Sequence, residues 1–168
     1  MIIDVLGLGE SLKEYRPSRN ITVGVNDINK YYRTNYFVCV DKPNKFNGER
    51  LNNIVNHKGI MFTHLGEWTD YRDINLIELT EARGVFTNID KDKICYSNNS
   101  TLVACVIAYK LGAKVINLYG ADFNTHNAFK DNSLEMVLKH FELLNEEFKK
   151  RGVTLNVTKQ SKLYEILK

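Results

Sequence analysis

Residues 2–11 read Ile2-Ile3-Asp4-Val5-Leu6-Gly7-Leu8-Gly9-Glu10-Ser11, a short apolar run followed by two glycines and a hydroxyl side chain. The run predicts a strand, and the glycines predict a tight turn after it. Gly7 and Gly9 would let backbone N–H groups approach an anion closely, and Ser11 stands at the entry to a predicted helix. The segment therefore predicts a phosphate-binding turn or, alternatively, a plain strand-to-helix turn capped by Ser11. It lacks the third glycine of a dinucleotide fingerprint and the lysine of a P-loop.

Apolar runs of similar length recur along the chain. Those bounded by turn residues predict strands at Ile2–Leu6, Ile21–Val25, Tyr36–Val40, Gly59–Leu65, Val115–Tyr119 and Thr154–Val157. Helical spacing predicts helices at Ser100–Leu111 and Ser133–Arg151. The order of these elements predicts an α/β fold, a three-layer Rossmann-like sandwich with a mostly parallel central sheet.

The remaining segments carry weaker patterns. Asp41–Asn56 is polar and predicts a surface excursion. Glu67–Lys93 predicts only loops around a short strand at Ile74–Leu79.

Composition narrows the class of protein. A chain of 168 residues, 43% of them hydrophobic, fits a single domain spanning residues 1–168. Its 23 basic and 20 acidic side chains are scattered, which does not favour a nucleic-acid partner. The longest apolar stretch, Leu102–Tyr109, is far shorter than a membrane span, and no basic leader precedes the first strand. Three cysteines without CxxC spacing predict reduced core residues, so we expect a cytoplasmic protein, with homo-oligomers possible.

Polar residues follow the predicted strands, where ligands bind in parallel sheets. Asn26 can hydrogen-bond a base or a phosphate. Asp27 and Asp41 can take a ribose hydroxyl or a metal-bound water, or alternatively form Asx turns and helix caps.

Further candidates surround the predicted helix at Ser100–Leu111. The small polar residues at its start offer more hydrogen-bonding groups than one cap needs, which favours ligand binding by Asn98, Asn99, Ser100 and Thr101. Gly120 and Asp122 follow a buried strand, so Asp122 should project at the same sheet edge.

These motifs together resemble a known group of proteins. Gly-x-Gly-x-Ser-Leu, the Asn that closes the second strand, the helix at 98–111 and Gly112–Phe123 resemble the domain shared by two families. These are the archaeal-type hydroxymethyldihydropterin pyrophosphokinase-like proteins and the bacterial lipooligosaccharide sialyltransferases. The resemblance spans nearly the whole chain and implies a Rossmann-like fold with a nucleotide or nucleotide-sugar ligand. It places Gly7, Gly9 and Ser11 near phosphate, Asn26 near base or phosphate, and Asn99, Ser100 and Thr101 near ribose or phosphate.

Two departures from the sialyltransferase pattern stand out. Glu10 replaces the usual proline before the motif serine, and Asn124–Asn132 is a short loop where the family has a long lid carrying a histidine base. Asn127 lies in what resembles the start of that lid. His126 is the obvious replacement base, because imidazole titrates near neutral pH, and Asp122 is the second candidate.

Three functions follow from this sequence. The first is a small nucleotide-donor-dependent glycosyltransferase of sialyltransferase-like type, with His126 or Asp122 deprotonating the acceptor. The second is a non-catalytic nucleotide-binding module, which the short lid favours. The third is a pyrophosphokinase-like enzyme whose Mg²⁺ would be held by Asp27, Asp41 or Asp122. No other cofactor is implied, and no structural zinc is expected because no His/Cys cluster exists.

Overall fold

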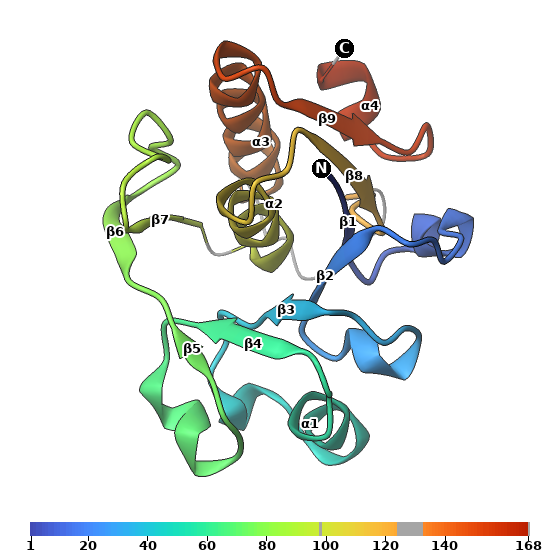
Figure 1. The fold of residues 1–168 in the computed structure, drawn as a ribbon, viewed down its shortest axis with the longest axis vertical. Helices are drawn as coiled ribbons and strands as arrows, with labels where there is room; N and C mark the ends of the chain where they lie inside the picture. Colours follow the sequence, from blue (N-terminus) through green and yellow to red (C-terminus); the bar gives the residue numbers. More distant parts are fainter. Residues whose placement is uncertain (98, 124–132, 168) are drawn as a thin grey trace.

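The computed structural model describes residues 1–97, 99–123 and 133–167, and its core is a seven-stranded sheet in which every strand pair is parallel (Figure 1). The strand order is β5-β4-β3-β2-β1-β8-β9. Their bounds are β1 Ile2–Leu6, β2 Ile21–Val25, β3 Tyr36–Val38, β4 Ile60–Thr63, β5 Asn75–Leu76, β8 Val115–Tyr119 and β9 Thr154–Val157. The predicted α/β Rossmann-like class is confirmed.

The first strand, β1, lies inside the sheet, with β2 to β5 on one side and β8 and β9 on the other (Figure 1). The connection that leaves β1 runs to β2 on one side of it, and the connection that enters β8 returns to its other side. This is a topological switch point, the place where open parallel sheets bind ligands at the carboxyl ends of their strands.

Helices cover both faces of the sheet. On one face lie α2, Ser100–Lys110, and α3, Ser133–Lys150, over the alternate residues Ile3 and Val5 of β1. Helix α2 is buried along Ser100–Ala108 because it is apolar on all sides, and it contacts β1, β2, β3 and β8.

The opposite face is covered by short helices, and Leu6 of β1 packs there. They are the 3₁₀ helices η1, Glu10–Glu14, η2, Ile28–Lys30, η3, Pro43–Lys45, and η4, Gly66–Asp70, with α1, Gly48–Val55. A short helix, α4, Leu163–Ile166, follows β9. The three cysteines are buried free thiols, as predicted.

Two local predictions differ from the structure. The excursion Asp41–Asn56 contains η3 and α1, which the sequence hid because Ile54 is the one buried residue of α1. The expected strand Ile74–Leu79 is divided between β5 and β6, Leu79–Arg83. Strand β6 pairs with β7, Ile94–Tyr96, in a separate two-stranded sheet (Figure 1).

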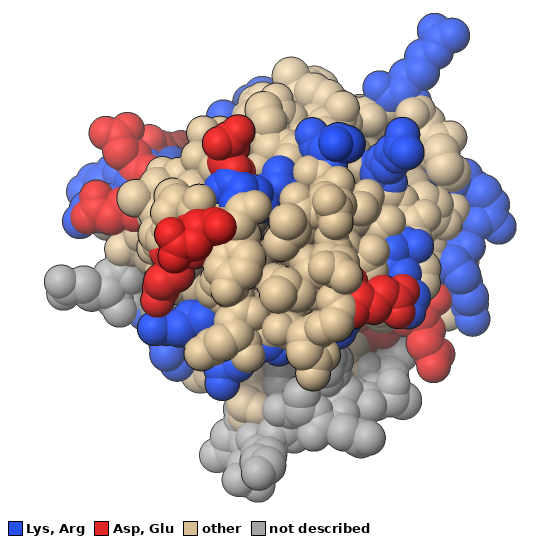
Figure 2. Space-filling model, turned by 90° about the horizontal axis from the view of Figure 1, so that it is seen from below, with Lys and Arg blue, Asp and Glu red and all other residues tan. Residues whose placement is uncertain are grey.

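On the face seen in Figure 2, Lys, Arg, Asp and Glu side chains surround a central area free of all four. Among the described residues, no helix has the length and apolar character needed to cross a membrane.

Candidate functional site

The glycine turn is joined to the loop after β8 by backbone hydrogen bonds. Gly7 N–H donates to the Tyr119 carbonyl and Gly9 N–H to the Gly120 carbonyl, each at 2.8 Å. A Cβ on Gly7 would lie 2.3 Å from the Gly120 oxygen, and one on Gly9 would lie 2.6 Å from Asp122 Oδ2. Real Cβ atoms essentially never approach other atoms this closely. Both glycines are therefore required by the contact between the two loops, with or without a ligand.

Ser11 and Asp122 continue this contact through their side chains. Ser11 N–H donates to Asp122 Oδ2 at 2.7 Å, and Gly120 N–H donates to Ser11 Oγ at 2.9 Å. Ser11 is fully buried, and it does not cap η1, whose N-cap residue is Gly9. The prediction of a Ser11 cap was wrong. We call the four hydrogen bonds that join Gly7, Gly9 and Ser11 to Tyr119, Gly120 and Asp122 the β1–β8 clasp.

The clasp changes which groups of the turn can meet a phosphate. The N–H groups of Gly7, Gly9 and Ser11 are already used, whereas in the described part of the chain those of Leu8 and Glu10 donate to nothing. The backbone donors that remain at this turn are therefore the amides of Leu8 and Glu10. The helix after the turn is a single 3₁₀ segment of five residues, too short to supply a strong dipole.

Asn26 lies at the end of β2 with a left-handed backbone, φ 48°. Its N–H donates to the Val38 carbonyl, and its Oδ1 accepts a long hydrogen bond of 3.4 Å from Ser100 Oγ. The structure thus brings together Asn26 and Ser100, which are separated by 74 positions in the sequence. Phe123, φ 57°, is the other described non-glycine residue with positive φ, and it also follows a strand of this edge. Strained backbone of this kind gathers at binding sites.

The polar residues predicted at the start of α2 have two different roles. Asn99 is the helix cap, since its Oδ1 accepts from Leu102 N–H at 3.0 Å. In the chain as described, the N–H groups of Ser100 and Thr101 carry no hydrogen bond, so the positive end of an 11-residue helix faces the Asn26 side chain. Asn98 lies outside the described residues.

The two other predicted aspartates make none of the hydrogen bonds of the clasp. Asp27 is buried and its Oδ1 accepts from Arg50 Nε at 3.1 Å and Nη2 at 2.8 Å. It occupies the N-cap position of η2, as one alternative expected, but makes no side-chain cap hydrogen bond. Asp41 is exposed, and its carbonyl accepts from Trp68 Nε1 at 3.0 Å. Within the described residues, no three His, Cys, Asp or Glu side chains are grouped to hold a metal ion.

Among the histidines, His57 has a structural role. It is 3% exposed, stacks on Phe37 and accepts from Gly59 N–H at 2.8 Å through Nδ1. Burial, with the nearby Arg72 cation, lowers the pKa of His57 to about 4. His140 is buried against Gly84 and Phe86, and burial lowers its pKa too. His126 and Asn127 lie outside the described residues.

Sequence reasoning missed two contributors at this sheet edge. Arg50 reaches the edge from α1, a helix that was not predicted, and nothing in its local pattern marks it. The free amides of Leu8 and Glu10 are backbone groups, and no side-chain pattern in the sequence marks them.

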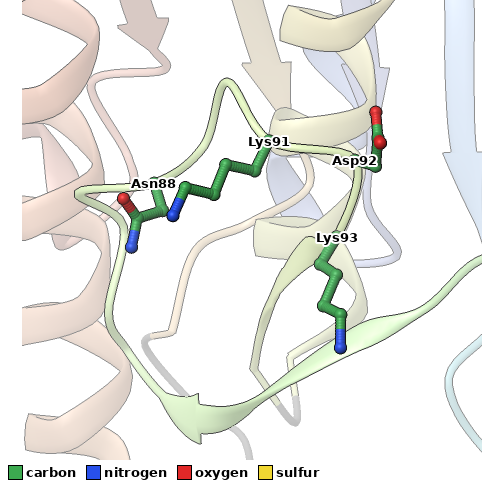
Figure 3. A pocket seen from close by; sticks show the side chains of 4 residues that line it. All are labelled: Asn88, Lys91, Asp92 and Lys93. Carbon is green, nitrogen blue, oxygen red and sulfur yellow. The ribbon is translucent and has the colours of Figure 1, made fainter.

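An open hollow of about 570 Å³ lies elsewhere, on the loop between β6 and β7 (Figure 3). Its lining residues are Asn88, Lys91, Asp92 and Lys93, all exposed; Lys91 extends toward Asn88 while Asp92 and Lys93 point in opposite directions (Figure 3). It contains none of the predicted residues and no buried polar side chain that would fix a ligand. The sheet edge remains the better candidate site.

Comparison with known proteins agrees with this architecture. The sialyltransferase CstII from Campylobacter jejuni, in complex with the substrate analogue CMP-3FNeuAc, matches 93% of this chain and 79% of its own with a TM-score of 0.53 and 15% identity. The chain has a sialyltransferase-like fold. CST-II in complex with a trisaccharide acceptor and CMP matches 99% of this chain and 85% of its own, with a TM-score of 0.58 and 15% identity. CstII with cytidine-5'-monophosphate gives a TM-score of 0.57 at 16% identity, over 99% of this chain and 83% of its own.

Sequence comparison adds no closer relative. No protein-family model matches the chain, and no curated protein matches it. The sialyltransferase part of the predicted resemblance therefore holds at the level of fold, while the pyrophosphokinase-like part stays a prediction.

Proposed function

We propose that this chain binds a nucleotide donor at the carboxyl edge of β1, β2 and β8 and acts as a small glycosyltransferase. The solved structures that share its fold hold CMP or a CMP-sugar analogue, which makes a cytidine nucleotide the first ligand to test.

One observation carries this proposal: the contact of Asn26 with Ser100 at the start of α2. It brings the free N–H groups of Ser100 and Thr101 to the end of β2, where Asn26 lies. Backbone donors at a helix N-terminus favour a phosphate or a carboxylate. The Nδ2 group of Asn26 adds a donor beside them, since its Oδ1 already faces Ser100.

The proposed reaction is a displacement at the sugar. The acceptor hydroxyl oxygen forms a bond to the anomeric carbon, the bond from that carbon to the phosphate oxygen breaks, and the nucleotide leaves with the electron pair. A base takes the acceptor proton. We assign that role to His126 rather than Asp122, because Asp122 Oδ2 is occupied by Ser11 N–H.

The same occupation of Asp122 favours the second candidate, a module that binds the nucleotide without turning it over. The pyrophosphokinase-like alternative has less support from the donor groups, since Asp27 is paired with Arg50 and lies apart from Asp122.

Binding and turnover are tested together. The assays are thermal shift and calorimetry. The ligands are CMP, a CMP-sugar, other nucleotides and nucleotide sugars, each tested with Mg²⁺ and with a chelator. We expect cytidine nucleotides to stabilise the protein in the presence of the chelator. Asn26→Ala should weaken CMP binding about tenfold, the loss that one hydrogen bond commonly carries, while the exposed Asn52→Ala control should not. Absence of a shift with every nucleotide tested would refute the proposal. Binding without release of CMP from the CMP-sugar, unchanged in His126→Ala, would favour the binding module.

A further inference from the structure

Asp122 occupies an unusual position for a residue that is expected to touch a substrate. It is 7% exposed, and its Oδ2 accepts from Ser11 N–H at 2.7 Å, the short length typical of a bond to a charged acceptor. Ser11 in turn accepts from Gly120 N–H through Oγ at 2.9 Å. Each loop therefore supplies one side chain that satisfies a backbone N–H of the other.

The two side-chain hydrogen bonds of the clasp lie just beyond the last backbone hydrogen bond between the two loops. Gly9 N–H pairs with the Gly120 carbonyl, but Phe123 turns the next peptide away with φ 57°, and the Asp122 carbonyl accepts from Lys162 N–H at 3.0 Å. The carboxylate of Asp122 supplies the acceptor that the backbone no longer offers to Ser11. Without it, the buried Ser11 N–H would be unpaired.

We propose that Asp122 is a positioning residue, which fixes the Gly7–Ser11 turn at the nucleotide site through Ser11, and that it is not the catalytic base. This rests on the proposed function. A base must reach the acceptor hydroxyl, whereas Oδ2 is occupied and Oδ1 is buried without a partner in the described residues. The turn does not hold this shape by itself, because its two glycines give the backbone a wide range of conformations.

Two substitutions separate positioning from proton transfer. Asp122→Asn keeps an oxygen that can accept from Ser11 N–H but cannot take up a proton, and Asp122→Ala removes both functions. For a positioning residue, Asp122→Asn should stay within about threefold of the wild type in Kd for CMP and in kcat with a CMP-sugar, while Asp122→Ala should lose about tenfold in Kd. For a base, both variants would lose about 10²-fold or more in kcat at unchanged Kd, and that result would overturn the proposal.

A second readout does not depend on any ligand. Amide hydrogen exchange at Ser11 should be about tenfold faster in Asp122→Ala than in the wild type and near the wild-type rate in Asp122→Asn. The control Glu142→Gln, an exposed side chain on α3, should change neither exchange nor binding. If wild-type protein binds no nucleotide, the proposed function fails, whereas the role of Asp122 in the clasp is still decided by exchange. Unchanged exchange at Ser11 in Asp122→Ala would overturn it.

The same interaction can be tested from the other loop if Asp122→Ala does not fold. Ser11→Ala removes the acceptor of Gly120 N–H but keeps its own N–H bond to Asp122. It should speed exchange at Gly120 but leave exchange at position 11 and CMP binding near the wild-type values, because Asp122 still holds the turn. Faster exchange at position 11 together with weaker CMP binding would overturn the proposal.

Discussion

Gly9→Ala tests whether the glycines of the turn serve the packing of two loops or the approach of a ligand. A Cβ at position 9 would lie 2.6 Å from Asp122 Oδ2, 2.9 Å from the Gly120 carbonyl oxygen and 3.1 Å from its carbon. Two of these three atoms belong to backbone that is fixed by the β1–β8 clasp, so they cannot move without breaking the Gly9–Gly120 hydrogen bond.

The cost follows from this geometry. Forcing one extra carbon into a packed site commonly destabilises a protein by about 1–3 kcal/mol, which for a chain of this size lowers the Tm by about 2–12 °C. Gly66→Ala is the matched control, since its Cβ would meet nothing within 4 Å and its backbone has no positive φ. That variant should keep the Tm or raise it slightly, because alanine restricts the unfolded chain.

The assay is thermal unfolding without ligand, followed by CMP binding on the folded variants. Gly9→Ala should unfold at a lower temperature before any nucleotide is added. A variant that keeps the wild-type Tm but no longer binds CMP would refute the packing explanation, because glycine would then be required only for the approach of the ligand.

Two further predictions concern residues that were candidates for function. The pKa of His57 falls from 6.5 to about 4 on folding, so the unfolded chain binds the proton more readily and stability is lost as pH falls below 6.5. Between about pH 7 and about pH 5 the wild type should lose about 2 kcal/mol more unfolding free energy than His57→Asn, as measured in urea, and equal losses would contradict the assignment. Asn99→Ala should lower the free energy of unfolding by about 1 kcal/mol, because it removes the cap of α2. Asn99→Asp should keep the stability, but its negative charge should weaken binding of the anionic CMP. Equal unfolding free energies of the Ala and Asp variants would argue against the cap.

The fold could be predicted from sequence wherever a short run rich in Val, Ile or Leu is bounded by turn residues. Strands β1, β2, β8 and β9 are runs of this kind, and they begin and end at the predicted residues. Helix α1 was missed for the opposite reason. Only one of its eight residues is buried, so its sequence shows no helical spacing of apolar residues. The helix makes tertiary contacts such as the Arg50–Asp27 ion pair, which a local pattern does not reveal.

The candidate site was predicted in part. The expectation that residues after β1, β2 and β8 meet at one sheet edge is supported by the clasp and by the Asn26–Ser100 contact. Their individual roles could not be derived, because a glycine needed by a ligand and a glycine needed by another loop look identical in a sequence. Ser11 and Asp122 are 111 positions apart, so no local pattern connects them.

The strand order also decides when the site can form during synthesis. The glycine turn leaves the ribosome with the first strand, but β1 then has an unpaired edge until β8 has been made, since β2 occupies only its other side. Unpaired edges of this kind make partly folded chains prone to associate. A nascent chain that stops after β5 therefore holds the complete glycine turn without the residues that shape it, so the site proposed for the nucleotide is complete only late in biosynthesis.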